Sequence, residues 1–304
     1  MIAVEIVAWV IVAAVSAPLL VLSAECFAAL LPRRRPAADG HRPRCVVLVP
    51  AHNEAAGIGR TLLAVIPQLG AGDSVLVVAD NCTDQTADVV RAAGCAVVER
   101  SDDLRRGKGY ALAHGVDRLR ADPPEVVAIL DADCVPAPGA IEGLVRAAVR
   151  TAGPVQGAYR MDPLTGAGPD KQVAAFAFTV KNVVRPLGLA RLGLPCLLTG
   201  SGMAFPWGVL ASADLGHGHI VEDMQLAIDL TRAGRPVRFV PEAEVRSEFP
   251  SADRATATQR RRWEHGHLTV LTTQAPRLLL GGLARGKWTW IGLGLELAVP
   301  PVSA

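Results

Sequence analysis

The charges of this 304-residue chain nearly cancel, because 31 Lys and Arg residues stand against 29 Asp and Glu residues and leave a formal charge of +2 at pH 7. Proteins that bind nucleic acid through its phosphates normally carry a basic surface. The basic residues between Arg33 and Arg44 form too short a stretch to provide one. We therefore expect no nucleic-acid partner, although this stretch could contact anionic lipid headgroups.

Cysteine pairs with metal or redox spacing are absent too. The six cysteines stand at positions 26, 45, 82, 95, 134 and 196, with no CxxC pair and no Cys/His cluster of zinc spacing. This pattern indicates small apolar side chains in a reducing compartment. The sequence also contains no internal repeat and no low-complexity tract.

Long apolar segments are what the chain has in excess. Half of its residues are apolar, a fifth are charged, and its mean hydropathy is +0.30. Residues 6–24 are 19 uncharged, mostly aliphatic residues, close to the roughly 20 that cross a bilayer as a helix. Arg33, Arg34 and Arg35 follow this run, whereas Glu5 precedes it. Because positive residues remain cytoplasmic, the sequence predicts an N-terminal transmembrane helix in the cell (inner) membrane, followed by a cytoplasmic domain.

Two alternatives to a retained anchor stay open, a cleaved signal peptide and a buried hydrophobic hairpin. A signal peptide would place its basic residues before the apolar core, and here they follow it. Residues 288–304 are again apolar but contain Glu296 and two prolines. They predict either the start of a second membrane segment or an interfacial helix. With one complete span at most, a transmembrane conduit would require further membrane subunits.

Strand and helix signals alternate from residue 45 onward. Short apolar runs predict strands at 45–49, 74–78, 95–99 and 126–130, with helices between them at 53–69, 86–93 and 109–119. This alternation indicates a parallel sheet with helices on both faces. The second half is less regular, with strands expected at 155–159, 197–205 and 237–239 and helices at 176–184 and 223–233.

Two carboxylates, Asp131 and Asp133, follow the apolar run at residues 126–130. A buried strand gains no stability from ending in two acidic residues, so they indicate a ligand. If the chain remains extended there, alternate side chains face the same side and both aspartates can reach one ligand. Their hard oxygens suit Mg²⁺ or Mn²⁺ bound to a substrate phosphate. The alternative is an Asx turn in which an aspartate caps the helix that starts near residue 138.

Other polar residues also fall at predicted strand ends. Asn53 and Glu54 follow the first strand, and Asp80 follows the second. Ligands of a parallel sheet bind beyond these ends, so the convergence favours ligand binding. The carboxylate of Asp80 can accept a hydrogen bond from a base or a ribose, and its alternative is a capped turn. The Gly-Lys-Gly run at 107–109 would let a cation approach a diphosphate, although a plain loop fits as well.

Two further motifs lie in the second half. Glu222 and Asp223 begin a predicted helix, where they would either complement the helix dipole or supply a general base and its orienting neighbour. Gln259, Arg262 and Trp263 would share one helical face. A basic helix usually means a solvated face, but an indole and an amide beside a guanidinium suggest a platform for a sugar or for a diphosphate leaving group.

In their order along the chain, seven segments resemble the family-2 inverting glycosyltransferases of the GT-A fold, and among these the membrane-bound, cellulose-synthase-like branch. The segments are VPAHNE at 49–54, ADNCTD at 79–84, GKGYAL at 107–112, DAD at 131–133, TGSG at 199–202, ED at 222–223 and QRRRW at 259–263. A DxD motif alone is weak evidence, whereas DxD, ED and QxxRW at these separations are specific. The resemblance covers residues 44 to 270.

The resemblance implies an α/β fold, a Rossmann-like and mostly parallel sheet flanked by helices. It divides the chain into a transmembrane anchor (1–31), a basic linker (32–43), a GT-A glycosyltransferase domain (44–275) and the start of a C-terminal membrane or interfacial segment (276–304). The implied activity is an inverting, hexosyltransferase-type transfer from a nucleotide-sugar, with UDP as the expected nucleotide. The implied acceptor is a lipid or a polysaccharide at the membrane.

The resemblance also implies a role for each donor-side residue. Glu54 and Asp80 would contact the uridine, and Lys108 would lie near it. Asp133 would bind the Mg²⁺ or Mn²⁺ cofactor on the diphosphate, with Asp131 close to the donor. A metal in this position would act mainly as a Lewis acid and a template.

On the acceptor side, Asp223 would deprotonate the attacking hydroxyl. Glu222, Gln259, Arg262 and Trp263 would line the acceptor and the departing diphosphate. An inverting transfer is one in-line displacement, which needs a base on the acceptor side.

The chain departs from this pattern at two places. Asn81 stands where many relatives carry a second acidic residue. The several spans that polymer-extruding relatives have after QxxRW are missing, so processive synthesis with secretion is not expected of this chain as it stands, and a longer native protein fits the sequence.

Two other functions stay open: a non-catalytic nucleotide-sugar-binding membrane protein, and a haloacid-dehalogenase-like phosphatase with Asp131 as nucleophile. The phosphatase motif normally lies near the start of its domain and leaves QRRRW unexplained.

Overall fold

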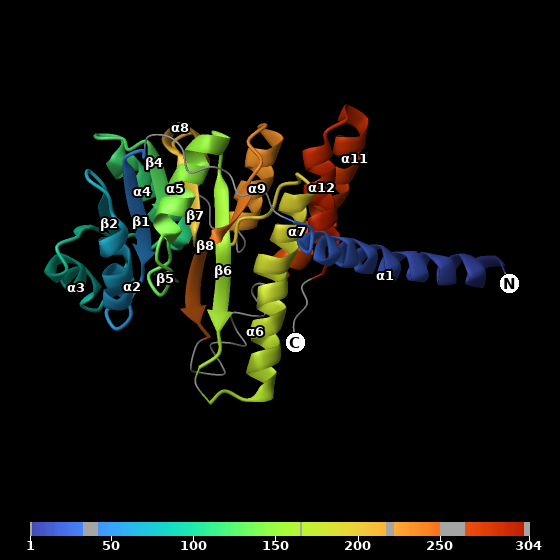
Figure 1. The fold of residues 1–304 in the computed structure, drawn as a ribbon, viewed down its shortest axis with the longest axis horizontal. Coiled ribbons are helices and arrows are strands. Elements are labelled where there is room, and N and C mark those ends of the chain that lie inside the picture. The colour runs from blue at the N-terminus through green and yellow to red at the C-terminus, as the bar shows by residue number, and fades with distance from the viewer. Residues whose placement is uncertain (1, 33–41, 165, 217–221, 250–264, 301–304) are drawn as a thin grey trace.

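A computed structural model describes residues 2–32, 42–164, 166–216, 222–249 and 265–300 of the chain. Its centre is an eight-stranded sheet with the order β3-β2-β1-β4-β7-β6-β8-β5 (Figure 1). The strands are β1 (Cys45–Ala51), β2 (Ser74–Asp80), β3 (Ala96–Arg100), β4 (Val126–Ile129), β5 (Val135–Pro136), β6 (Val155–Asp162), β7 (Met203–Pro206) and β8 (Arg238–Glu248).

The first half of the sheet is parallel, as the sequence predicts. Strand β1 pairs in parallel with β2 and with β4, and β2 pairs in parallel with β3. The second half is mixed, because β7 runs antiparallel to both β4 and β6, while β6 and β8 are parallel. The predicted mostly parallel α/β sheet is therefore confirmed, with β7 and β5 as antiparallel additions.

Helices cover both faces of the sheet, and each face has its own apolar core. One face carries α2 (Ile58–Val65) with the short helix η1 (Ile66–Gln68), α3 (Thr86–Ala92) and α5 (Ala140–Thr151), and the other carries α4 (Lys108–Leu119) and α9 (Glu222–Arg232). Helix α5 buries a stripe at Ile141, Leu144, Val145 and Ala148, which is the i, i+3, i+4, i+7 spacing of an amphipathic helix. Helix α4 packs closely because Gly115 has no side chain to strike Leu48 of β1.

The strand expected at residues 197–205 is shorter than predicted. Gly200 and Gly202 have φ angles of +89° and +68°, which is not strand conformation, so β7 begins only at Met203. Residues 197–202 instead form a loop beyond the carboxyl end of β4, where the Gly202 N–H donates to the Ile129 carbonyl at 3.0 Å. A short helix, α8 (Trp207–Leu210), follows β7.

A long helix runs beside β6 (Figure 1). It comprises α6 (Pro169–Thr179), a π-helical turn η2 (Val180–Val184) and α7 (Arg185–Arg191). Within the described ranges this segment, Pro169–Arg191, is long and apolar enough to cross a membrane by length and composition, and a third of its most apolar 18-residue stretch is buried. Its middle carries Lys181 and Arg185, which line a cavity described below.

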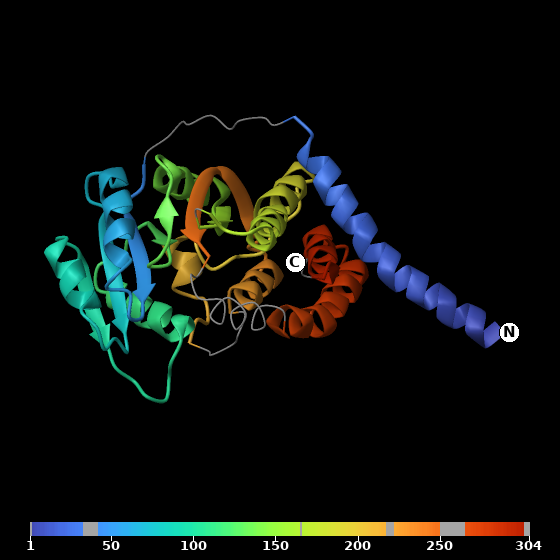
Figure 2. The same ribbon diagram turned by 90° about the horizontal axis from the view of Figure 1, so that it is seen from below.

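The N-terminal helix α1 (Ile2–Ala29) projects away from the body of the molecule in two perpendicular views (Figures 1 and 2). Trp9, Leu19 and Leu20 on its outer part are 56–71% exposed. Its last turns, where Glu25 and Ala28 are buried, pack mainly against α7. The chain closes with α11 (Ala275–Arg285) and α12 (Trp288–Ala298), which pack on each other and place α12 against α1 and α9.

Candidate active site

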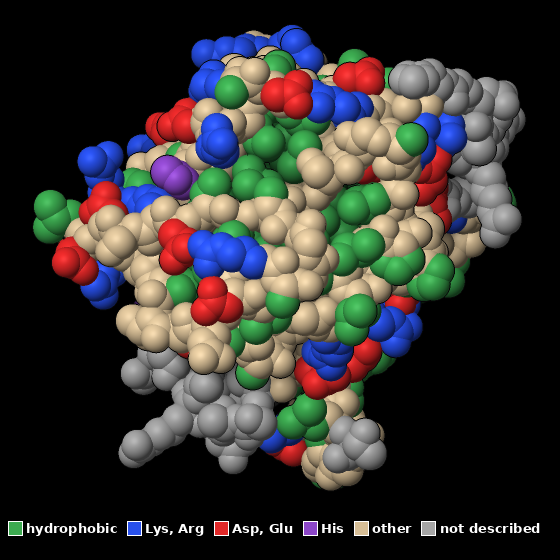
Figure 3. Space-filling model, turned by 90° about the vertical axis from the view of Figure 1, so that its left-hand side faces the viewer, with side chains coloured by type: hydrophobic (Ala, Val, Ile, Leu, Met, Phe, Trp, Pro, Cys, Tyr) green, Lys and Arg blue, Asp and Glu red, His purple; other side chains and the backbone are tan. Residues whose placement is uncertain are grey.

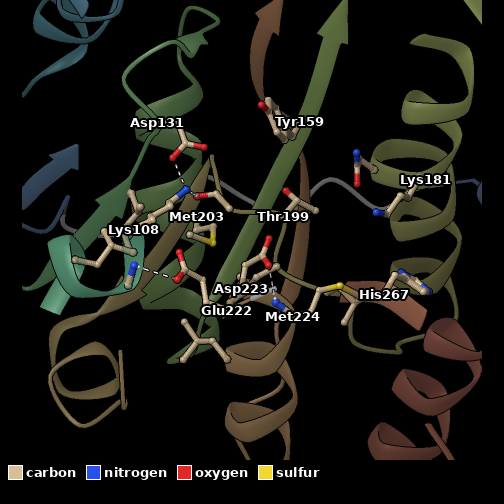
Figure 4. Close-up of a pocket in the computed structure, with 18 of the residues that line it drawn as sticks. Lys108, Asp131, Tyr159, Lys181, Thr199, Met203, Glu222, Asp223, Met224 and His267 are labelled. Atoms are coloured by element: carbon tan, nitrogen blue, oxygen red, sulfur yellow. Dashed lines mark hydrogen bonds and ion pairs between the residues drawn. The ribbon is translucent and has the colours of Figure 1, made fainter. Parts of the chain in front are cut away.

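A cavity of about 490 Å³ opens beyond the carboxyl end of β4. Its walls come from α4, the loops that follow β4 and precede β7, strand β6, the turn η2, helix α9 and helix α12. This volume falls within the range of roughly 300–1,000 Å³ that small-molecule sites occupy. Figure 4 shows Lys108, Asp131, Thr199 and Asp223 around the hollow, with Lys181 facing them from the long helix.

The two aspartates of the DxD motif reach this cavity through a turn. Strand β4 ends at Ile129, and the Cys134 N–H donates to the Asp131 carbonyl at 3.1 Å, so the condition that the chain remains extended there is not met. The turn still brings them together, because one ligand atom each from Asp131, Asp133 and Cys134 lies within 4.8 Å of the others. The helix-capping alternative is also wrong, since α5 begins after Gly139 without a side-chain cap.

Lys108 binds one of these two aspartates and leaves the other without an ion pair. Its ammonium forms an ion pair with Asp131 and donates to the Gly200 carbonyl at 2.8 Å. Asp133 accepts a long bond from the Cys134 thiol at 3.5 Å and has no ion-pair partner within the described ranges. Partial desolvation in the cavity, together with the charge of Asp131, raises the pKa of Asp133. A cation would relieve both of these costs.

The helix α9 presents the Glu-Asp pair in its first turn. Glu222 accepts a hydrogen bond from the Gly109 N–H at 3.0 Å, which ties the start of α9 to the start of α4. Asp223 accepts one from the Met224 N–H at 2.9 Å. Desolvation raises the pKa of Asp223, while the nearby charge of Lys108 lowers it to a smaller extent. A carboxylate in this state is a stronger base than an exposed aspartate.

Gly200 marks the point where these groups converge. A Cβ atom built there would lie 3.3 Å from Lys108 Nζ, 3.5 Å from Asp223 Oδ2 and 3.9 Å from Asp131 Oδ2. The φ angle of +89° also suits glycine rather than residues with a side chain. The TGSG segment therefore leaves room for a ligand among the three charged groups.

The two predicted nucleotide-contacting residues lie at the same edge of the sheet but outside the lining of this cavity. Asp80 is buried, and its carboxylate forms an ion pair with Arg100 at 2.5 Å. Burial, Asp133 and Asp131 raise the pKa of Glu54, which places its carboxylate near the DxD turn. Asn53 and Asn81 have φ angles of +55° and +52°, a conformation that asparagine tolerates better than most residues and that often occurs at functional loops.

The structure thus brings Lys108, Asp131, Asp133, Glu222 and Asp223 into one cavity and places Glu54 and Asp80 beside it. Gln259, Arg262 and Trp263 lie outside the described residues.

Sequence reasoning missed the far side of the cavity. Polar residues there come from the long helix, from residues 265–273 and from α12, and they are Lys181, Asn182, Arg185, His267 and Glu296. A signal was present for all of them except His267, because each of the others is a polar residue within a mostly apolar segment. From the sequence, Glu296 is interpreted only as an interruption of a membrane segment.

A mixed α/β sheet with carboxylates and a lysine at this edge is the architecture of a GT-A-type glycosyltransferase. The chain belongs to the glycosyltransferase-like family 2, because the model of that family matches residues 43–266. The predicted fold and family are therefore confirmed, and the family assignment gives the phosphatase alternative no support.

Two curated relatives share about a quarter of their aligned residues with this chain. The probable glycosyltransferase YdaM of Bacillus subtilis is 25% identical over 244 residues, which cover 75% of this chain and 56% of YdaM. Glucomannan 4-beta-mannosyltransferase 7 of Arabidopsis thaliana is 24% identical over 258 residues, which cover 78% of this chain and 45% of that protein. The chain thus spans about half the length of these relatives.

Two solved structures share the fold. Mannosyltransferase PcManGT from Pyrobaculum calidifontis, in complex with GDP-Man and Mn²⁺, matches with a TM-score of 0.65 and 21% identity, over 94% of this chain and 81% of that chain. Glucosyl-3-phosphoglycerate synthase from Mycobacterium tuberculosis, in complex with Mn²⁺, UDP and glucosyl-3-phosphoglycerate, matches with a TM-score of 0.52 and 23% identity, over 77% of this chain and 84% of that chain.

Proposed function

We propose that this protein is a membrane-anchored, metal-dependent inverting glycosyltransferase. It moves a sugar from a nucleotide-sugar, with UDP as the expected nucleotide, to an acceptor on a lipid or a glycan. The observation that carries this proposal is the convergence of Lys108, Asp131 and Asp223 around Gly200, with Asp133 in the adjoining turn. The family assignment and the metal-bound, nucleotide-bound structures of the same fold support it.

The carboxylates of the DxD turn suit Mg²⁺ or Mn²⁺. Both ions prefer oxygen ligands, and Asp133 offers oxygens that no lysine or arginine of the described ranges occupies. Cys134 is a poor third ligand, because burial raises the pKa of its thiol and keeps it protonated. When bound, the ion would neutralise charge on the diphosphate that leaves.

The residues of the chain then divide the reaction between them. Asp223 takes the proton of the acceptor hydroxyl as its oxygen bonds to the anomeric carbon. The bond from that carbon to the diphosphate oxygen breaks on the opposite side, which inverts the anomeric configuration. The ammonium of Lys108, held by Asp131 and the Gly200 carbonyl, lies where it can stabilise the departing charge. Glu222 aligns the two helix starts through the Gly109 N–H.

The nucleotide is expected beside the cavity, at Glu54 and Asp80. Asp80 would reach a ribose or base while Arg100 holds its carboxylate in place. Gln259, Arg262 and Trp263 stay predictions for the diphosphate and acceptor side.

Membrane attachment rests on α1. Its outer part carries exposed apolar side chains and no packing partner within the described ranges. A bilayer would cover that surface. The predicted orientation puts the catalytic domain on the cytoplasmic face of the membrane. We expect it to take its nucleotide-sugar donors from the cytoplasm.

A thermal-shift titration of the full chain in detergent tests this function. UDP-sugars and GDP-sugars should raise Tm only when Mn²⁺ or Mg²⁺ is present, because a ligand that binds the native state stabilises it by mass action. Asp133→Ala should abolish the metal-dependent shift, and Asp223→Asn should keep it while transfer falls by roughly 10²-fold or more. Asp117→Asn, at an exposed position outside the cavity, is the matched control. Metal-independent binding, or full transfer by Asp223→Asn, would refute the proposal.

A further inference from the structure

The cavity continues past Asp223 to a polar floor that the proposed chemistry does not use. Lys181 and Asn182 line it from η2, His267 lines it from residues 265–273, and Glu296 lines it from α12. His267 and Glu296 are only 2% and 3% exposed. Polar side chains this deeply buried are normally hydrogen-bonded, because desolvation without a partner is unfavourable.

Several polar atoms of this floor lack that partner. His267 Nδ1, Glu296 Oε2 and Thr199 Oγ1 are buried without a hydrogen-bond partner in the part of the chain that the structure describes. Lys181 likewise has no ion pair or hydrogen bond there, and its amine points into the hollow opposite Asp223 (Figure 4). Unmet donors and acceptors that line one cavity are what a polar ligand would satisfy.

The tautomer of His267 shows what kind of group it can receive. Its Nε2 lies 3.1 Å from the Val299 carbonyl, which can only accept, so Nε2 carries the hydrogen. Burial lowers the pKa of His267 to about 4, so the ring is neutral near pH 7. Nδ1 is therefore an acceptor and needs a donor from the ligand.

The floor as a whole combines donors with acceptors. The Lys181 ammonium donates, His267 Nδ1 accepts, and the hydroxyl of Thr199 does both. Glu296 accepts when ionised and can donate when protonated, and burial raises its pKa to about 8. A phosphate or carboxylate could accept a hydrogen bond from Lys181. It has no hydrogen to donate to His267 Nδ1, and its negative charge would lie next to the carboxyl group of Glu296. Several hydroxyl groups, each of which donates one hydrogen bond and accepts others, can together satisfy all four.

We propose that this floor, formed by Lys181, Thr199, His267 and Glu296, is the acceptor subsite, and that it takes a hydroxyl-bearing ring such as a sugar. The inference rests on the proposed function, since Asp223 must be the base that activates the acceptor. It narrows the substrate class from a lipid or a glycan to an acceptor whose reacting end carries several hydroxyl groups. Apolar residues in the same cavity, such as Met203 and Leu198, can pack against the face of that ring.

Transfer assays with matched probes test the subsite. The full chain in detergent is given a metal and the nucleotide-sugar that stabilises it, with octyl β-glucoside, octyl phosphate or octanol as acceptor below micelle concentrations. We expect transfer to the glucoside, and at least tenfold less to octanol and to the phosphate. These probes share one tail, so the difference reports the head group.

Variants then assign the subsite to its residues. Thr199→Val is nearly isosteric and removes a hydroxyl that has no partner among the described residues, so folding should tolerate it. Glu296→Leu should raise KM for the glucoside at least tenfold, Thr199→Val severalfold, and Glu296→Gln should restore part of the loss, while the donor KM changes less than twofold. Thr272→Val, on an exposed side chain of the same helical stretch as His267, should match the wild type.

The outcomes separate the two proposals. A wild-type protein that gains no metal-dependent stability from any nucleotide-sugar and releases no nucleotide with any probe would refute the glycosyltransferase function itself. Transfer to octyl phosphate in preference to the glucoside would leave that function standing and overturn the subsite, because Lys181 alone would then select the acceptor. Unchanged acceptor KM in both Thr199→Val and Glu296→Leu would overturn it too.

Discussion

At the scale of single residues, the three aspartates of the cavity differ in role because they have different neighbours. Asp131 is bound by Lys108 and so serves best as a structural partner of that lysine. Asp133, which no cation of the described ranges pairs with, keeps its oxygens for a ligand. Asp223 accepts one backbone hydrogen bond and otherwise faces the hollow. The sequence places all three near a strand or helix end, but it contains no information on which of them the lysine selects.

The pH dependence of transfer should move when Lys181 is neutralised. Asp223 acts as a base only when deprotonated. Desolvation raises its pKa; among the nearby charges, those of Lys108 and Lys181 lower this pKa and that of Asp131 raises it. Lys181→Met removes one of the lowering charges, so the pKa of Asp223 rises further. The acid limb of the kcat/KM profile should therefore shift to higher pH, measured by nucleotide release across pH 5 to 9.

An exposed lysine provides the comparison for that profile. Lys287→Met changes the same charge at a position outside the cavity, and its acid limb should coincide with that of the wild type. A shift of the Lys181→Met limb to lower pH, or none at all, would mean that Asp223 is not the titrating base.

At the scale of secondary-structure elements, the sequence predicts the first half of the sheet well. The strands that begin near residues 45, 74, 96 and 126 all form, because each is a short apolar run between polar turns. Since parallel strands end at one edge, the convergence of Asp80, Asp131 and Glu54 could be foreseen as well. These features depend on local patterns and on one general rule of sheet topology.

The second half depends on contacts that no local pattern shows. The apolar run at 197–205 has the composition of a strand, but the two left-handed glycines turn its first part into a loop. The π-helical turn η2 lies within an ordinary apolar helix pattern, and π turns commonly mark functional sites. Lys181 and Glu296 are more than 100 residues apart and meet only because α12 folds back beside the long helix.

Helices α1 and α7 cross so closely that adding one methyl group at Gly188 tests their packing. A Cβ atom at Gly188 would lie 1.9 Å from the backbone oxygen of Glu25, and a backbone atom cannot rotate away. Gly188→Ala should therefore separate the two helices and reduce the free energy of unfolding by about 1–3 kcal/mol. Thermal unfolding in detergent, followed by circular dichroism, measures the loss.

A second glycine controls for the substitution itself. Gly208 lies in α8, and a Cβ atom added there would have nothing within 4 Å. Gly208→Ala should therefore be neutral or slightly stabilising, as expected for alanine in a helix. Equal stability of Gly188→Ala and the wild type would show that α1 does not pack on α7 in the protein.

At the scale of the whole molecule, the end of helix α1 and the cavity belong to one packed body. Glu25, just past the apolar run of α1, forms a buried ion pair with Arg185, and Arg185 donates to the Glu296 carbonyl at 2.9 Å. The end of α1 therefore supports the wall that carries the proposed acceptor subsite. The opposite side of the molecule, in Figure 3, mixes acidic, basic and apolar side chains without a large patch of one charge. That mixture agrees with the near-zero net charge of the chain.

Two truncations separate anchoring from packing. Removing residues 2–20 deletes the exposed part of α1 but keeps Glu25 and Ala28, which are buried. This variant should leave the membrane fraction and retain the Tm of the wild type in detergent.

Removing residues 2–31 also deletes Glu25, which leaves Arg185 buried without its partner, and an uncompensated buried charge costs about 3–5 kcal/mol. We therefore expect a lower Tm and a weaker affinity for the acceptor only in the longer deletion. Equal stability of the two truncated proteins would show that α1 serves as an anchor alone, and membrane retention of the shorter deletion would assign attachment to α11 and α12 instead.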